Sequence, residues 1–134
     1  MKNWVLKKSN LSSKQNKQLE DINMSASHLL RIINDILDVS KIEAGKLQLE
    51  KVHFNINELF ADLSDIINEQ VANKGIETNF DIVDVPEWLS GDATRVKQSL
   101  LNYISNAIKF TETGSINITA KKSQDIDERV LIRF

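Results

Sequence analysis

Apolar residues recur through the first third of the chain at alternating intervals of three and four residues. This a/d spacing is typical of a supercoiled helix, and two further leucines widen the stripe beyond a strict seam, which favours packing against more than one other helix. Ser12 and Gln15 have capping-box spacing before the stripe, and Gly45 follows it, so we predict a helix over residues 13–44. The stripe consists of Leu19, Ile22, Ala26, Leu29, Ile33 and Ile36, widened by Leu30 and Leu37.

The hydrophobic period changes after Gly45. Apolar and polar residues alternate over residues 47–54, with one interruption, which predicts a strand with a bulge or bend. Asn55 and Glu58 then form a second capping-box pair before an amphipathic helix that extends to Gly75.

The remainder of the chain predicts a mixed α/β region. We expect, in order, a strand over 76–82, a loop over 86–91, a helix capped by Asp92 and ending near Phe110, and strands over 114–122 and 129–134 joined by a turn at 123–128. The predicted fold class is therefore α+β. A long bundle or stalk helix precedes a partial two-layer α/β sandwich, in which helices cover one face of a mixed sheet.

Composition narrows the class of protein. The 134 residues are 41% hydrophobic and 27% charged, with 4 Gly and 1 Pro, as in a globular domain. The net charge of −2 gives no bulk electrostatic reason to bind nucleic acid or an anionic membrane. No cysteine is present, and no uncharged apolar run reaches the roughly 20 residues of a spanning helix. We expect a cytoplasmic chain, with any inner-membrane anchor of the parent protein in other segments.

One face of the predicted helix 92–110 combines amides with basic groups. Arg95, Asn102, Asn106 and Lys109 share a narrow sector. Two amides one turn apart can offer neutral oxygens to Mg²⁺, and the lysine can meet phosphate oxygens. On spacing alone, an ordinary solvated helix face remains the alternative. The opposite, apolar side carries Val96, Leu100, Tyr103, Ile104, Ala107 and Ile108.

Three segments in the right order resemble sensor histidine kinases of two-component systems. Residues 102–111 (NYISNAIKFT), preceded by residues 91–98 (GDATRVKQ), resemble the N box of the Bergerat-fold ATP-binding domain. Residues 27–47 (SHLLRIINDILDVSKIEAGKL) resemble the second helix of the dimerisation and histidine-phosphotransfer domain of hybrid-type kinases, with its junction into the ATPase domain. Residues 84–92 are similar to the segment that these kinases place before the N box.

The resemblance implies ATP and Mg²⁺ as cofactors and assigns roles along the helix. Asn106 would be the principal Mg²⁺ ligand and Asn102 its companion. Lys109 would contact phosphate, and Phe110 would line the nucleotide pocket. Arg95 lies on the same face, although an arginine near a helix start can equally pair with a carboxylate.

The chain also departs from the family pattern. The H box that carries the phosphoacceptor histidine is missing, so we expect no catalytic residue here and read His28 and His53 as structural. Residues 4–6 could be the tail of the first bundle helix. The chain ends before the glycine-rich boxes, including the Asp-x-Gly-x-Gly motif. Residues 1–45 would then be part of the dimerisation and phosphotransfer domain, and residues 46–134 the N-terminal part of the ATP-binding domain.

The expected function is that of part of a protein-histidine kinase, which autophosphorylates a histidine with ATP and transfers the phosphate to a response-regulator aspartate. The fragment alone would be inactive. Its expected partners are a second copy, bound through the stalk helix, and a receiver domain, with no nucleic acid and no membrane contact. One alternative is a non-catalytic module for dimerisation or regulator docking. The other is a different Bergerat-fold ATPase, such as a serine kinase acting on an anti-sigma antagonist.

Overall fold

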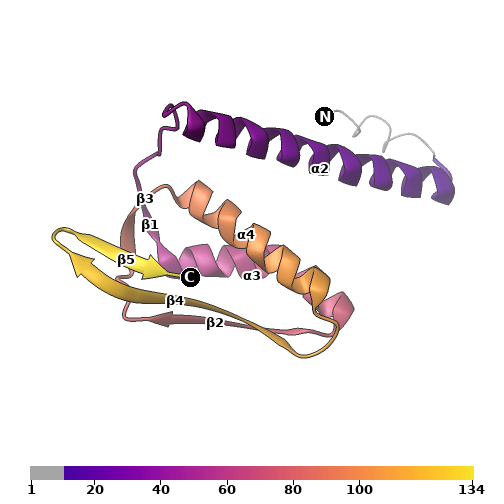
Figure 1. Cartoon of the computed structure of the whole chain (residues 1–134). Helices are drawn as coiled ribbons and strands as arrows, with labels where there is room; N and C mark the ends of the chain where they lie inside the picture. The colour runs from indigo at the N-terminus through magenta and orange to yellow at the C-terminus, as the bar shows by residue number, and fades with distance from the viewer. Residues whose placement is uncertain (1–10) are drawn as a thin grey trace. The chain divides into compact units, whose positions relative to one another are not determined.

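The computed structural model describes residues 11–134, and the chain divides into two compact units, Met1–Gln48 and Leu49–Phe134. In the described part of the first unit, residues 11–48, there is one long helix, α2 (Ser13–Glu43; Figure 1). Its predicted capping box is confirmed, because Ser12 Oγ accepts from Gln15 N–H at 3.3 Å and Gln15 Oε1 accepts from Ser12 N–H at 3.0 Å. The helix ends at Glu43, and Gly45, two residues later, takes the left-handed conformation with φ 66°. The predicted tail of a first bundle helix lies outside the described residues.

The apolar stripe of α2 remains uncovered. None of its residues is buried, and the side chains of Leu29 and Ile36 are 58% and 60% exposed. Burial of such side chains is worth about 1.5–3 kcal/mol each, so the stripe is a strong candidate for contact with another helix. Within residues 11–134, no helix is long and apolar enough to cross a membrane.

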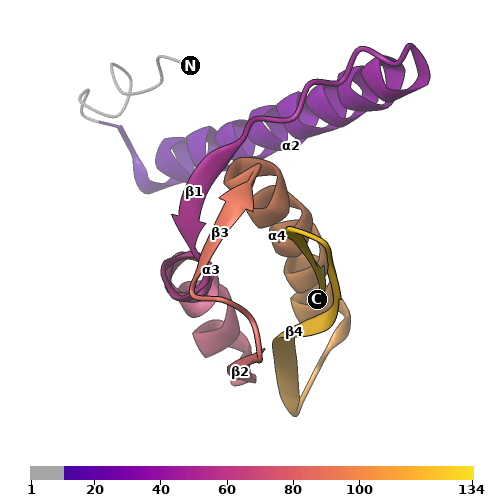
Figure 2. The same cartoon turned by 90° about the vertical axis from the view of Figure 1, so that its left-hand side faces the viewer.

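The second unit is built on a mixed sheet, as predicted. β2 (Glu77–Val83) pairs in parallel with β4 (Ser115–Ile126), and β4 pairs antiparallel with β5 (Arg129–Arg133). Two further strands, β1 (Val52–Asn55) and β3 (Trp88–Gly91), form a separate antiparallel pair, which is seen side by side in Figure 2.

Two helices, α3 (Ile56–Lys74) and α4 (Ala93–Phe110), lie on the same side of the mixed sheet (Figure 1). The core forms where they pack on the strands, and the ring of Phe60 meets that of Phe80 edge-on at 5.4 Å. The unit therefore has the predicted arrangement of helices over a mixed sheet. Its buried apolar residues are Ile56, Leu59, Phe60, Leu63, Ile67, Val71, Ile76, Leu100, Ile104, Ile108, Ile116, Ile118 and Ala120.

Asn55 begins α3 and connects it to the neighbouring strand pair. Its Oδ1 accepts from the N–H groups of Asn57 at 2.8 Å and Glu58 at 3.3 Å, which caps the helix. Its Nδ2 donates to Glu87 Oε1 at 3.0 Å, just before β3. The side chain is buried, so this amide both starts the helix and fixes the approach to β3.

Three sequence predictions about strands were wrong in extent or kind. Residues 47–51 are not in a strand, and the predicted loop over 86–91 contains β3, which pairs with β1. The predicted turn at 123–128 is shorter, because β4 continues to Ile126 through a register shift between Lys122 and Gln124. A four-residue strand gives little periodic signal, and a bulge interrupts the alternation on which the prediction rested.

Candidate functional site

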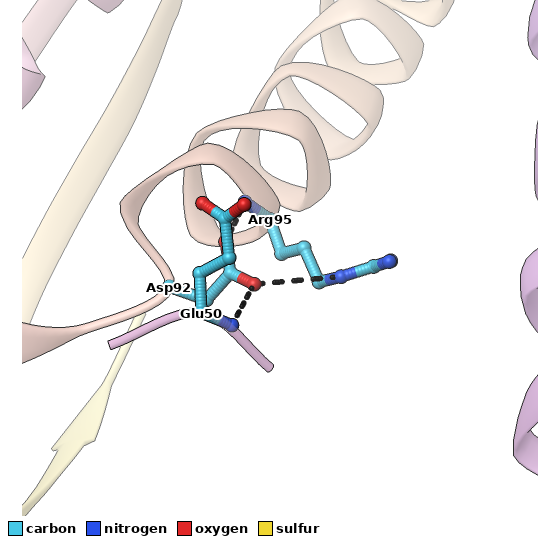
Figure 3. Close-up of polar contacts among 3 residues, drawn as sticks. All are labelled: Glu50, Asp92 and Arg95. Carbon is cyan, nitrogen blue, oxygen red and sulfur yellow. Dashed lines mark hydrogen bonds and ion pairs between the residues drawn. The ribbon is translucent and has the colours of Figure 1, made fainter. Parts of the chain in front are cut away.

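The candidate site is centred on α4, whose first turn is fixed by one buried carboxylate (Figure 3). Asp92 Oδ1 accepts from Arg95 N–H at 3.1 Å, as the predicted cap requires. Asp92 Oδ2 accepts from the backbone N–H of Glu50 at 3.0 Å and lies 3.5 Å from Arg95 Nε. The Asp92 side chain is only 8% exposed. One side chain therefore fixes the start of α4, the Arg95 guanidinium and the segment that enters β1.

The C-terminal half of α4 carries four of the five predicted site residues. Asn102 is half-buried and Asn106 is exposed one turn later, as the predicted amide pair requires. Because Asn106 is exposed, its side-chain amide faces solvent. The Lys109 ammonium lies 5.3 Å from the ring centroid of Phe110, and both side chains are exposed. The donor set consists of neutral amide oxygens beside a cation, which fits a hydrated Mg²⁺ carrying phosphate groups.

The apolar side of α4 is divided between the core and an open cavity. Leu100, Ile104 and Ile108 are buried, whereas Tyr103 on the same side of the helix is 76% exposed. The helix carries more apolar surface than the sheet covers. The cavity beside it, of about 660 Å³, is lined by Leu49, Asp92, Arg95, Val96, Ser99, Leu100, Tyr103, Ile104, Ala107, Ile116, Asn117, Ile118, Thr119 and Phe134.

This cavity separates the predicted site residues into two groups. Arg95 belongs to its lining, whereas the other four predicted residues do not. Arg95 is also beside Asp92, which was the alternative considered for an arginine at a helix start. Its role toward a nucleotide stays a prediction.

Two lysines connect α3 to α4, and neither was singled out by the sequence. Lys97 Nζ donates to Asp62 Oδ2 at 2.8 Å. Lys74 Nζ donates to the backbone carbonyls of Ile108 at 2.7 Å, Lys109 at 3.1 Å and Thr111 at 3.2 Å. These contacts span 34 to 37 positions, so no local pattern could have revealed them.

The two histidines lie outside this site. His28 is exposed on α2 with its Nδ1 3.2 Å from an Arg31 guanidinium nitrogen, and His53 is exposed on β1. Their interpretation as structural residues stays a prediction. Across residues 11–134, no group of three or more His, Asp or Glu side chains is placed to hold a metal ion.

Comparisons with known proteins agree with this arrangement. Residues 3–45 match the family described as His Kinase A (phospho-acceptor) domain. The chain is 40% identical over 131 residues to hybrid signal transduction histidine kinase B of Dictyostelium discoideum, covering 97% of this chain and 7% of that protein.

Two solved structures of histidine kinases also match along most of the chain. Full-length ShkA in complex with AMPPNP matches with a TM-score of 0.67 and 29% identity, covering 89% of this chain and 25% of that one. Histidine kinase ThkA in complex with response regulator protein TrrA matches with a TM-score of 0.59 and 26% identity, over 97% of this chain and 38% of that one.

A long helix followed by an α/β unit with a mixed sheet is thus an arrangement found in histidine kinases. Nearly the whole chain is similar to parts of sensor histidine kinases, and its first third matches their phospho-acceptor domain. It spans between 7% and 18% of the length of the first curated relatives that it matches.

Proposed function

We propose that the chain supplies a dimerisation helix and the N-box part of the ATP-binding domain to a protein-histidine kinase. In this proposal residues 1–45 belong to the dimerisation and phosphotransfer domain, and residues 46–134 belong to the ATP-binding domain. The reaction is ATP-dependent phosphorylation of a histidine, followed by transfer to a response-regulator aspartate. The observation that carries the proposal is the exposed amide of Asn106, one turn from Asn102 and one turn from Lys109.

In this proposal, different residues of α4 bind different parts of Mg-ATP. Asn106 and Asn102 supply neutral oxygens to the cation, and Lys109 supplies positive charge to the phosphates. Phe110 offers an exposed ring beside Lys109 as a wall of the nucleotide pocket. Mg²⁺, when bound, neutralises charge on the phosphate oxygens during transfer. Because α4 is capped by Asp92 and packed through its buried leucine and isoleucines, these side chains project from a rigid helix.

The proposed partners follow from α2 and from the comparisons. The uncovered apolar stripe of α2 fits a second copy of the chain, which would give a homodimer. The structure of ThkA with TrrA supports a response-regulator receiver domain as the other partner, because this chain matches that kinase over 97% of its own length. The match of residues 3–45 to the phospho-acceptor domain family disfavours the alternative of a serine kinase.

The decisive test changes the Asn106 amide in the complete kinase that contains this chain. We expect Asn106→Ala to lower phosphorylation by about tenfold or more, since a factor of ten corresponds to ~1.4 kcal/mol of transition-state stabilisation. Asn68→Ala is the matched control, because Asn68 is an exposed amide on α3 outside the proposed site.

Two outcomes would contradict the proposal. If the activity of Asn106→Ala stays within about twofold of that of the unchanged kinase, Asn106 is not a metal ligand, since the lost transition-state stabilisation would be well under ~1 kcal/mol. A complete kinase that incorporates no phosphate while it still dimerises would instead favour the non-catalytic docking module.

A further inference from the structure

Helices α3 and α4 run side by side in the same direction. Lys97 of α4 contacts Asp62 of α3, and Lys109 O of α4 contacts Lys74 of α3. Both contacts advance by the same amount along each helix, 74 − 62 = 12 residues on α3 and 109 − 97 = 12 on α4. The helices are therefore parallel, and their C-terminal ends lie together on the right-hand side of Figure 1.

This arrangement places two negative helix ends next to each other. Each helix C-terminus carries about half a negative charge and leaves its last four carbonyls without helical partners. Two such ends in contact repel each other, and a cation between them relieves the repulsion. Lys74 is the last residue of α3, and its ammonium reaches the end of α4.

The Lys74 ammonium satisfies two of the carbonyls that α4 leaves without helical partners. The Ala107 carbonyl already accepts from Thr111 N–H at 3.0 Å. Lys74 donates to the next two carbonyls, those of Ile108 and Lys109, and to that of Thr111 just beyond the helix. An ammonium group has three donors, so all of them are used here.

The backbone around Lys74 is itself fixed. Gly75 takes the left-handed conformation with φ 67° and caps α3, and Ile76 N–H donates to Val71 O at 3.1 Å. Because the Lys74 backbone is held on both sides, its side chain is anchored at one end by α3 and at the other by three carbonyls of α4.

We propose that Lys74 is a positioning residue that holds the last turn of α4 in place for nucleotide binding. The turn that it clamps contains Lys109 and Phe110, and the bond to Thr111 O fixes where the chain leaves the helix toward β4. Lys74 contacts neither the proposed cation ligands nor the proposed phosphate contact through their side chains. The effect of Lys74 on nucleotide binding rests on the proposed function. The hydrogen bonds between Lys74 and the end of α4 are a property of the fold and do not depend on it.

The first test measures the clamp without any nucleotide. In the 134-residue chain, we expect Lys74→Met to speed amide exchange at Thr111 about tenfold, because Met keeps the aliphatic stem but loses all three hydrogen bonds. Lys97→Met is the matched control, since it removes the other lysine contact between α3 and α4 at the opposite end of α4. Exchange at Thr111 that is unchanged in Lys74→Met, or equally faster in both variants, would overturn the clamp.

The second test measures positioning in the complete kinase. We expect Lys74→Met to raise the KM for Mg-ATP about threefold or more with kcat within about twofold, whereas Lys97→Met leaves both parameters unchanged. Lys74→Arg retains several donors, and we expect it to restore the KM to within about twofold of the original value. A KM that does not move in Lys74→Met would overturn the positioning role.

These outcomes are distinguishable from failure of the proposed function. If Asn106→Ala abolishes activity while Lys74→Met leaves the KM unchanged, the proposed Mg-ATP site is supported and the positioning role of Lys74 is refuted. If Asn106→Ala has no effect, the proposed site falls, and the amide exchange of Thr111 still decides whether Lys74 clamps α4.

Discussion

The backbone N–H of Glu50 donates to Asp92 Oδ2 at 3.0 Å across 42 positions of sequence. Glu50 precedes β1, and Asp92 is the N-cap of α4, so the segment entering the second unit is fastened to the helix that carries the candidate site (Figure 3). The same carboxylate caps α4 through Arg95 N–H. The start of the unit and the start of α4 therefore depend on one side chain.

We expect Asp92→Ala to lower the free energy of unfolding of the chain by roughly 1–3 kcal/mol, because it removes an N-cap and leaves the Glu50 N–H without its acceptor. Asp92→Asn keeps an oxygen for one of the two donors, and we expect a smaller loss. Urea denaturation followed by circular dichroism measures both variants. A loss below about 0.5 kcal/mol for Asp92→Ala would show that the carboxylate does not anchor the segment.

Substitution of Gly75 is predicted to destabilise the chain through backbone strain alone. Its φ of 67° is left-handed, and an added Cβ would meet nothing within 4 Å. We expect Gly75→Ala to cost about 1–2 kcal/mol in unfolding free energy from backbone strain. In Gly91→Ala, the control, the added Cβ would lie 3.8 Å from the Phe54 ring in ordinary contact, and we expect a cost under about 0.5 kcal/mol. Equal midpoints of thermal unfolding for the two variants would contradict this.

The 134-residue chain is predicted not to phosphorylate itself. Its sequence contains no H box and no Asp-x-Gly-x-Gly motif, and His28 lies beside Arg31 on α2. Incubation with labelled ATP and Mg²⁺, followed by measurement of acid-labile phosphate, is expected to give no incorporation. Incorporation that disappears in His28→Ala would instead identify that histidine as a phosphoacceptor.

Self-association is predicted to occur through α2. The side chains of Leu29 and Ile33 are 58% and 44% exposed, and each large apolar side chain left in water forfeits about 1.5–3 kcal/mol. We expect sedimentation equilibrium at tens of micromolar (~10–50 µM) to detect a dimer, which Leu29→Lys with Ile33→Lys dissociates. Ser27→Lys with Asn34→Lys adds the same charge at exposed polar positions of α2 and should leave the dimer intact. A monomer at every concentration would refute the stripe as an interface.

The helices were predictable because their signals are local. Capping at Ser12, Asn55 and Asp92, together with the glycines that end α2 and α3, placed helix boundaries to within a residue or two. β3 was not predictable, because its identity as a strand depends on pairing with β1 more than 30 positions away, and four residues carry little pattern.

The candidate site was predictable for the residues that a helical sector brings together. Asn102, Asn106 and Lys109 are spaced by turns of one helix, so their relation follows from the helical repeat. Tyr103 could not be placed, since its exposure depends on how far the sheet extends beneath α4. The contacts of Lys74 could not be predicted either, because only the packing of α3 against α4 brings its ammonium to the carbonyls at the end of α4.

The division of β4 between two partners has a practical consequence. Its first seven residues pair with β2, whereas residues beyond the register shift pair only with β5, so the end of the hairpin extends past β2 (Figure 1). The connecting turn is exposed and contains Asp127 at a positive φ of 52°. Exposed turns of this kind accept inserted segments with little effect on the domain that carries them. The turn is therefore the place to attach a fluorophore or an affinity tag that leaves α2, α3 and α4 untouched.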